Sequence, residues 1–91
     1  MSNEKLEQLA DMLKTALVVN PNDAFKRYQY ATTLSKLGKP QDAIRQFKQT
    51  INAKPDHFDA HYQLAQTLAG IENWNEACDA FAGAAALKKD H

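Results

Sequence analysis

The 91-residue sequence predicts an all-α fold, an α-α superhelix of about two and a half helical repeats made of five antiparallel helices. Three observations predict this fold. The chain matches itself in register at a spacing of 34 residues. Apolar residues recur at three- and four-residue spacing, which is typical of amphipathic helices. Prolines and a glycine stand where these stretches would begin or end, and no stretch alternates with the two-residue period of a strand.

The clearest helix is predicted over residues 39–55, at the centre of the chain. Pro40 suits the first turn of a helix, where its missing N–H costs no hydrogen bond. Pro55 closes the segment. One apolar stripe runs along this helix and consists of Ala43, Ile44, Phe47, Thr50 and Ile51.

Two helices are predicted before it, over residues 3–19 and 24–37. Pro21 ends the first of them, and Gly38 follows the second at the position where a left-handed residue commonly closes a helix. Each has one apolar face that predicts the side turned to the core. The faces consist of Leu6, Leu9, Leu13, Ala16 and Leu17 in the first helix and Tyr30, Ala31, Leu34 and Leu37 in the second.

Two more helices are predicted after it, over residues 57–69 and 74–88. Asn73 and Glu76 have the spacing of a capping box at the start of the last helix. The apolar stripe of the fourth helix consists of Leu64, Ala65 and Leu68.

The repeat has a recognisable pattern. Its period and its Ala-x3-Phe followed by Pro resemble the tetratricopeptide-repeat family over essentially the whole chain. The resemblance implies a half repeat over residues 2–21 and full repeats over 22–55 and 56–91. The residues that carry it are Arg27, Tyr30, Ala31, Leu34, Ala43 and Phe47 in the first full repeat and His61, Leu64, Ala65, Leu68, Ala77 and Phe81 in the second.

The two full repeats differ at the turn between their helices. Glu72 stands at the place of Gly38, so we expect the second turn to differ from the first. Trp74 is expected to wedge between the two helices of its repeat. Arg27 and His61 occupy the position that the family pattern gives to tryptophan.

Composition excludes several classes of partner. Eleven basic and eleven acidic residues cancel, so the chain has no basic field for nucleic acid or for an anionic membrane. We therefore expect no nucleic-acid binding. We also expect no membrane span, because no run approaches about 18 apolar residues. The N-terminal residues lack the apolar core of a signal peptide. The single cysteine suits a reducing compartment, and we expect the protein to be cytoplasmic.

The sequence predicts no catalytic, cofactor or metal site, and therefore no enzyme. It contains none of the common nucleotide-binding or hydrolase motifs. His57 and His61 have a spacing that can hold a metal weakly, but no third ligand accompanies them, so a helix-start histidine and a surface histidine are favoured. Cys78 matches Ile44 of the preceding repeat, so we expect a buried thiol rather than a nucleophile.

The resemblance implies a concave groove, lined by the first helix of each repeat, that binds extended or helical peptides. Glutamine amides can pair with a peptide backbone, and tyrosines supply rigid contact area. The other interpretation is that these are ordinary solvated positions. Tyr28 and Thr32 replace the lysine and asparagine of family members that clamp a terminal carboxylate, so that clamp is not expected. The implied groove residues are Phe25, Tyr28, Gln29, Thr32, Lys36, Asp59, Tyr62, Gln63 and Gln66.

We therefore predict a protein-interaction module, a scaffold or adaptor that binds a peptide or protein partner. One alternative is a scaffold that self-associates through its uncapped ends, for which a homodimer is the simplest form. Another is a helical regulatory fragment of a larger protein or enzyme. The residues expected to carry self-association are Leu6, Leu9, Leu13, Cys78, Ala85 and Leu87.

Overall fold

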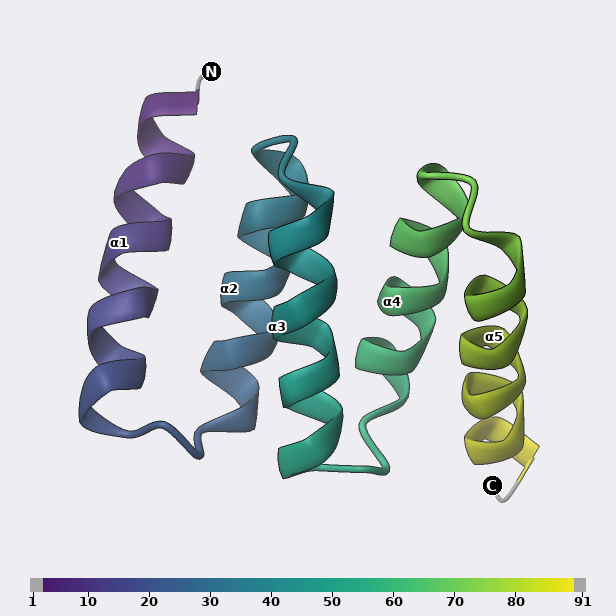
Figure 1. Cartoon of the computed structure of the whole chain (residues 1–91). Coiled ribbons are helices and arrows are strands. Elements are labelled where there is room, and N and C mark those ends of the chain that lie inside the picture. Colours follow the sequence, from purple (N-terminus) through teal and green to yellow (C-terminus); the bar gives the residue numbers. More distant parts are fainter. Residues whose placement is uncertain (1–2, 90–91) are drawn as a thin grey trace.

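A computed structural model of the protein describes residues 3–89, and over this range it consists of five α-helices joined by short turns, with no strand (Figure 1). This confirms the predicted all-α repeat fold, and the helix bounds lie close to the predicted ones. The helices are α1 (Asn3–Val19), α2 (Ala24–Lys36), α3 (Pro40–Ala53), α4 (Phe58–Gly70) and α5 (Trp74–Lys89).

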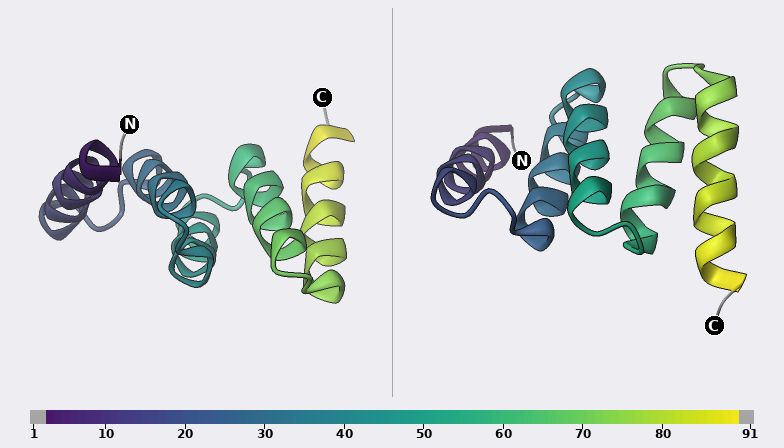
Figure 2. Two further views of the ribbon diagram at one scale, coloured as in Figure 1. Left: turned by 90° about the horizontal axis from the view of Figure 1, so that it is seen from above. Right: turned by 60° about the horizontal axis from the view of Figure 1, so that its bottom comes forward.

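Each helix packs against the next one along the chain, and α1 and α5 lie at opposite ends of the row (Figures 1 and 2). Contact also exists between α2 and α4, the first helices of the two full repeats. Two neighbours therefore cover α3, whereas within the described residues α5 packs only against α4. This difference decides which repeat positions are buried.

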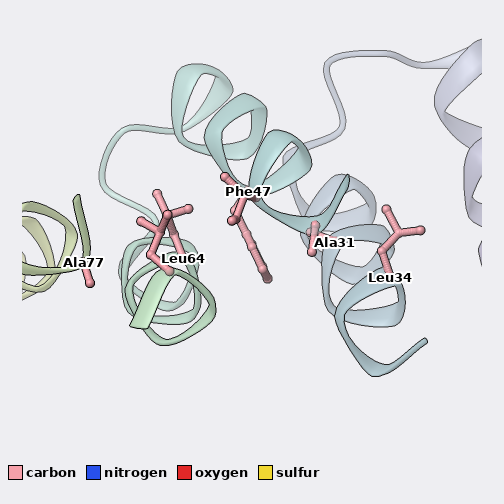
Figure 3. Packing of buried hydrophobic residues seen from close by; sticks show 8 residues of the cluster. Ala31, Leu34, Phe47, Leu64 and Ala77 are labelled. Carbon is pink, nitrogen blue, oxygen red and sulfur yellow. The ribbon is translucent and has the colours of Figure 1, made fainter. Parts of the chain in front are cut away.

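Phe47 lies at the centre of the core and is completely buried. Figure 3 shows its ring between Ala31 of α2 and Leu64 of α4. Ala31 is also fully buried and lets α2 and α3 approach closely. Burying a phenylalanine contributes about 1.5–3 kcal/mol, so this cluster holds the two full repeats together. The buried cluster consists of Ala31, Leu34, Ala43, Ile44, Phe47, Leu64, Leu68 and Ala77.

The two first helices begin in the same way although their capping residues differ. The carboxylate of Asp23 accepts a hydrogen bond from the Lys26 N–H at 3.1 Å, and Nδ1 of His57 accepts one from the Ala60 N–H at 3.1 Å. Each acceptor satisfies one N–H that a helix start leaves unpaired. His57 is therefore a helix-start histidine, as predicted.

The two turns between paired helices are alike, so the expectation that they differ is wrong. Gly38 has φ 78° and Glu72 has φ 64°, both in the left-handed region. After α2, the Lys39 N–H donates to the Leu34 carbonyl at 3.0 Å, and after α4 the Asn73 N–H donates to the Leu68 carbonyl at 2.9 Å. The hydrogen bonds of this helix-closing motif stabilise it even where a glutamate must take the left-handed conformation.

Two further expectations for α5 are wrong. Trp74 is 61% exposed, because it is the first residue of its helix and lies outside the apolar stripe. Cys78 is exposed, although its equivalent Ile44 is buried. No described helix follows α5 to cover that face, whereas α4 covers α3. At the start of α5, Asn73 donates a side-chain hydrogen bond to the Glu76 carboxylate at 2.6 Å.

Candidate functional site

The predicted groove residues share one face on each of two helices. Their spacing along α2 and α4 is three or four residues, so each set lies along one stripe. Phe25 and Tyr62 are exposed, at 64% and 39%, while Lys36, Asp59 and Gln66 are also at the surface.

Tyr28 is less available than predicted. Its ring packs on Phe47 with centroids 5.8 Å apart and on His57 with centroids 4.8 Å apart. Burial, with a smaller contribution from the Asp59 carboxylate, raises the pKa of Tyr28 above its usual value of 10.0. Thr32 is also engaged, since its hydroxyl donates to the Tyr28 carbonyl at 2.7 Å. Tyr28 therefore seals the junction between the two repeats rather than standing free in a groove.

Three aromatic residues of the second repeat form an exposed cluster, which we call the aromatic cluster. Tyr62 stacks on Phe58 with centroids 6.0 Å apart and 11° between ring planes. It also meets the edge of Phe81 at 6.0 Å. Phe81 is 38% exposed, although its equivalent Phe47 is completely buried. The amide of Gln66 donates to the Tyr62 hydroxyl at 3.2 Å and fixes one side of the cluster.

A cavity of about 380 Å³ lies where the C-terminal ends of α2 and α4 meet the start of α3, and we call it the groove. Two of the predicted residues, Gln63 and Gln66, line it, and the other predicted residues are not part of its wall. The remaining lining residues were missed. The sequence signal that could have predicted these residues is the cluster of small residues near the C-terminal ends of α2 and α4. The full wall consists of Ser35, Gly38, Pro40, Gln63, Gln66, Thr67, Gly70 and Ile71.

The wall of this groove combines polar side chains with apolar surface and carries no charged residue. Gln63 and Gln66 carry amides that both donate and accept hydrogen bonds, and Ser35 carries a hydroxyl. One N–H of the Gln66 amide is given to the Tyr62 hydroxyl, which leaves its second N–H and its oxygen for a ligand. The hydroxyl of Thr67 is engaged by its own helix, because it donates to the Gln63 carbonyl at 2.7 Å. An extended peptide presents alternating N–H and carbonyl groups, which two neighbouring amides can pair with.

The residues predicted for self-association divide into two groups. Leu13 is 7% exposed and lies in the core, so it cannot contribute a surface as expected. Its side of α1 faces α2. Leu9 is 42% exposed. The others lie on α1 and α5 and are exposed or half-buried: Leu6, Cys78, Ala85 and Leu87.

His61 and Arg27, at the pattern's tryptophan position, both anchor the turn that precedes their helix. Nε2 of His61 lies 2.8 Å from the Pro55 carbonyl, and Nη2 of Arg27 donates to the Pro21 carbonyl at 2.9 Å. Among residues 3–89, no three His, Cys, Asp or Glu side chains are grouped to hold a metal ion. None of the described helices is long and apolar enough to cross a membrane.

The chain is similar to one protein family and to several known proteins. The family model of anaphase-promoting complex, cyclosome, subunit 3 matches residues 4–84. The peroxisomal targeting signal receptor of Kluyveromyces lactis is 28% identical over 86 residues, which cover 94% of this chain and 15% of that receptor. The receptor of Saccharomyces cerevisiae is 26% identical over 76 residues, 84% of this chain and 12% of its own length. The chain thus spans a small part of these relatives.

Solved structures that share the fold include YrrB and MamA. YrrB, described as a TPR protein with an unusual peptide-binding site, is 30% identical with a TM-score of 0.88, covering 97% of this chain and 45% of YrrB. The crystal structure of MamA is 22% identical with a TM-score of 0.92, covering 94% of this chain and 50% of MamA. At that identity the likeness to MamA shows the fold alone.

Proposed function

This chain belongs to the tetratricopeptide-repeat family, through the family of anaphase-promoting complex subunit 3, and we propose that it binds a peptide segment of a partner protein in the groove between α2 and α4. It is a protein-interaction module. The observation that carries the proposal is the pair of amides at Gln63 and Gln66 on the wall of an uncharged cavity of about 380 Å³.

The groove suits the main chain of an extended peptide better than a charged side chain. Its wall holds no acidic or basic residue, so the groove selects through amide hydrogen bonds and the apolar surface of Ile71. Some of the related proteins are named for what they bind: YrrB for an unusual peptide-binding site and the yeast receptors for a peroxisomal targeting signal. We propose that this chain acts by binding alone, as an adaptor or scaffold in the cytoplasm.

A displayed peptide library selected on the purified chain supplies the ligand for the test. Replacing Gln63 and Gln66 together by alanine is expected to weaken the selected peptides by about 1–3 kcal/mol while the helical circular dichroism stays unchanged. Gln41→Ala is the matched control, since Gln41 is exposed on α3 and is not part of the groove wall. Equal affinity in the folded double variant would refute the groove as the binding surface.

Self-association is a second candidate, and the aromatic cluster favours it. Phe81 and Tyr62 are 38% and 39% exposed, which makes an apolar patch of the kind that marks contacts. Light scattering at about 100 µM detects a dimer held by roughly 5 kcal/mol or more. We expect Phe81→Glu to dissociate such a dimer and Leu9→Glu, at the other end of the row, to leave it intact. A strictly monomeric mass would rule out this candidate.

A further inference from the structure

The two repeats carry equivalent cavities, of which the first is partly filled by side chains and the second is wider. The first cavity lies between α1, α2 and α3 and has a volume of about 240 Å³. The second cavity lies between α3, α4 and α5 and has a volume of about 430 Å³. Lys14 and Leu17 line the first, and their equivalents in the 34-residue register, Lys48 and Ile51, line the second.

The second cavity is separate from the groove. On α4, residues His61, Leu64 and Leu68 line this cavity, whereas Gln63 and Gln66 line the groove. Because each helical residue turns by about 100°, these two sets lie on opposite faces of α4. A ligand in the second cavity therefore leaves the groove free.

Side chains of the chain itself partly fill the first cavity. Tyr30 and Arg27 project from α2 into its wall. Nη1 of Arg27 donates to the side-chain oxygens of Gln46 and Gln49, each at 2.7 Å. An aromatic ring and a guanidinium held by side-chain oxygens thus occupy part of the space between the three helices.

Each of these filling residues is replaced by a smaller one in the second repeat. Leu64 stands for Tyr30, Ala80 for Gln46 and Gly83 for Gln49. His61 stands for Arg27 and makes the equivalent contact to the preceding turn, at the Pro55 carbonyl, but its side chain is shorter and its ring lies against Gly83. A Cβ added at Gly83 would lie 3.0 Å from Nδ1 of His61, which shows how closely the ring is packed there.

The charges around the second cavity differ from those around the first. Lys48 and Glu76 form an ion pair at 3.4 Å with both side chains half exposed. Asp79 lines the cavity, where the first repeat has Arg45. Among the described residues Asp79 forms no ion pair. One positive and two negative side chains therefore give this cavity a net negative charge above an apolar floor.

We propose that the second cavity binds an aromatic side chain and a neighbouring arginine of a partner peptide, the two groups that Tyr30 and Arg27 supply within the first repeat. An apolar cavity of about 150 Å³ holds a benzene ring, and the second cavity exceeds the first by more than that. Leu64, Ile51 and Ala80 contact the ring. The carboxylate of Asp79 pairs with the guanidinium, for which a planar two-point contact is favourable.

The probe is a synthetic hexapeptide that carries arginine and tyrosine separated by two alanines, titrated into the ¹⁵N-labelled protein up to about 5 mM, a range that detects weak binding. We expect saturable shifts of the Ile51, Leu64 and Ala80 amides. A control peptide with glutamate for arginine and alanine for tyrosine is expected to give none.

Two variants test the site in different ways. Ala80→Gln restores the filling residue of the first repeat and is expected to abolish the shifts. Asp79→Arg alters only an exposed charge, which keeps the fold intact, and is expected to weaken binding at least about tenfold, the size of a lost charge-assisted hydrogen bond. Gln66→Ala, in the groove, is expected to bind the probe unchanged. The proposal is overturned if the amides do not shift, if both variants bind as the parent does, or if Gln66→Ala removes binding.

Discussion

Replacing Glu72 by glycine should stabilise the protein, because this residue is a non-glycine in the left-handed region. Its φ is 64°, where an L side chain crowds the following carbonyl, and the equivalent residue of the other repeat is Gly38. The turn hydrogen bonds are the same in both repeats, so the substitution changes the backbone preference and leaves the turn in place.

The expected gain follows from two opposing contributions. The left-handed conformation costs an L residue about 1–2 kcal/mol. Glycine removes that cost but loses more conformational freedom on folding, which offsets about 0.5–1 kcal/mol. The net stabilisation is therefore about 0.5–1 kcal/mol, which for a domain of this size raises Tm by about 2–8 °C.

A series at this position separates backbone strain from charge. We expect the order Gly, then Asn, then Ala and Glu together, since asparagine tolerates the left-handed region and alanine removes only the carboxylate. Urea unfolding followed by circular dichroism measures each variant, and an unchanged m-value confirms that the unfolded state is the same. Gly38→Ala is the reverse control. A Cβ there meets no atom within 4 Å, so its expected loss of about 1 kcal/mol comes from the backbone alone.

The reasoning would be refuted if Glu72→Ala stabilised the protein as much as Glu72→Gly does. The gain would then come from removing the carboxylate. An unchanged or lower stability of Glu72→Gly at equal m-value would show that the left-handed conformation carries no strain at this turn.

Two further predictions concern aromatic residues. Phe47→Ala should lower the free energy of unfolding, measured in urea, by about 3–5 kcal/mol. Phe81→Ala should lower it by only about 1–2 kcal/mol, because Phe81 is 38% exposed. Equal losses in the two variants would contradict the unequal burial. The raised pKa of Tyr28 means that the unfolded state loses its phenol proton first, so stability should fall as pH rises above about 10. Between about pH 9 and 11 the parent should lose more stability than Tyr28→Phe, and parallel pH profiles of the two proteins would contradict this.

The repeat and its helix bounds were predictable because periodicity reports which face of a helix is apolar. Ala31, Phe47 and Leu64 were all assigned to the core on that basis and are buried. Periodicity does not report how many neighbours cover a face. Cys78 therefore repeats the spacing of Ile44 and is nevertheless exposed, because α5 has one described neighbour and α3 has two.

The groove was only partly predictable for a related reason. Gln63 and Gln66 follow from the stripe on α4, but Ser35 lines the groove because of where α2 and α4 come together, which sequence spacing does not determine. The left-handed Glu72 was missed because its side chain disfavours this conformation. Only the hydrogen bonds that close α4 reveal why it is adopted.

The one-sided packing of α5 also bears on how the chain opens. Separating α5 breaks its packing against α4 and the ion pair from Glu76 to Lys48 of α3, while separating α3 breaks packing against both of its neighbours and uncovers Phe47. Opening of α5 therefore needs less free energy than global unfolding, and its amides exchange with solvent hydrogen ahead of those of α3. Because the second cavity is walled by α3, α4 and α5 together, any ligand held there ties the end helix α5 to α3 and slows the exchange of the α5 amides.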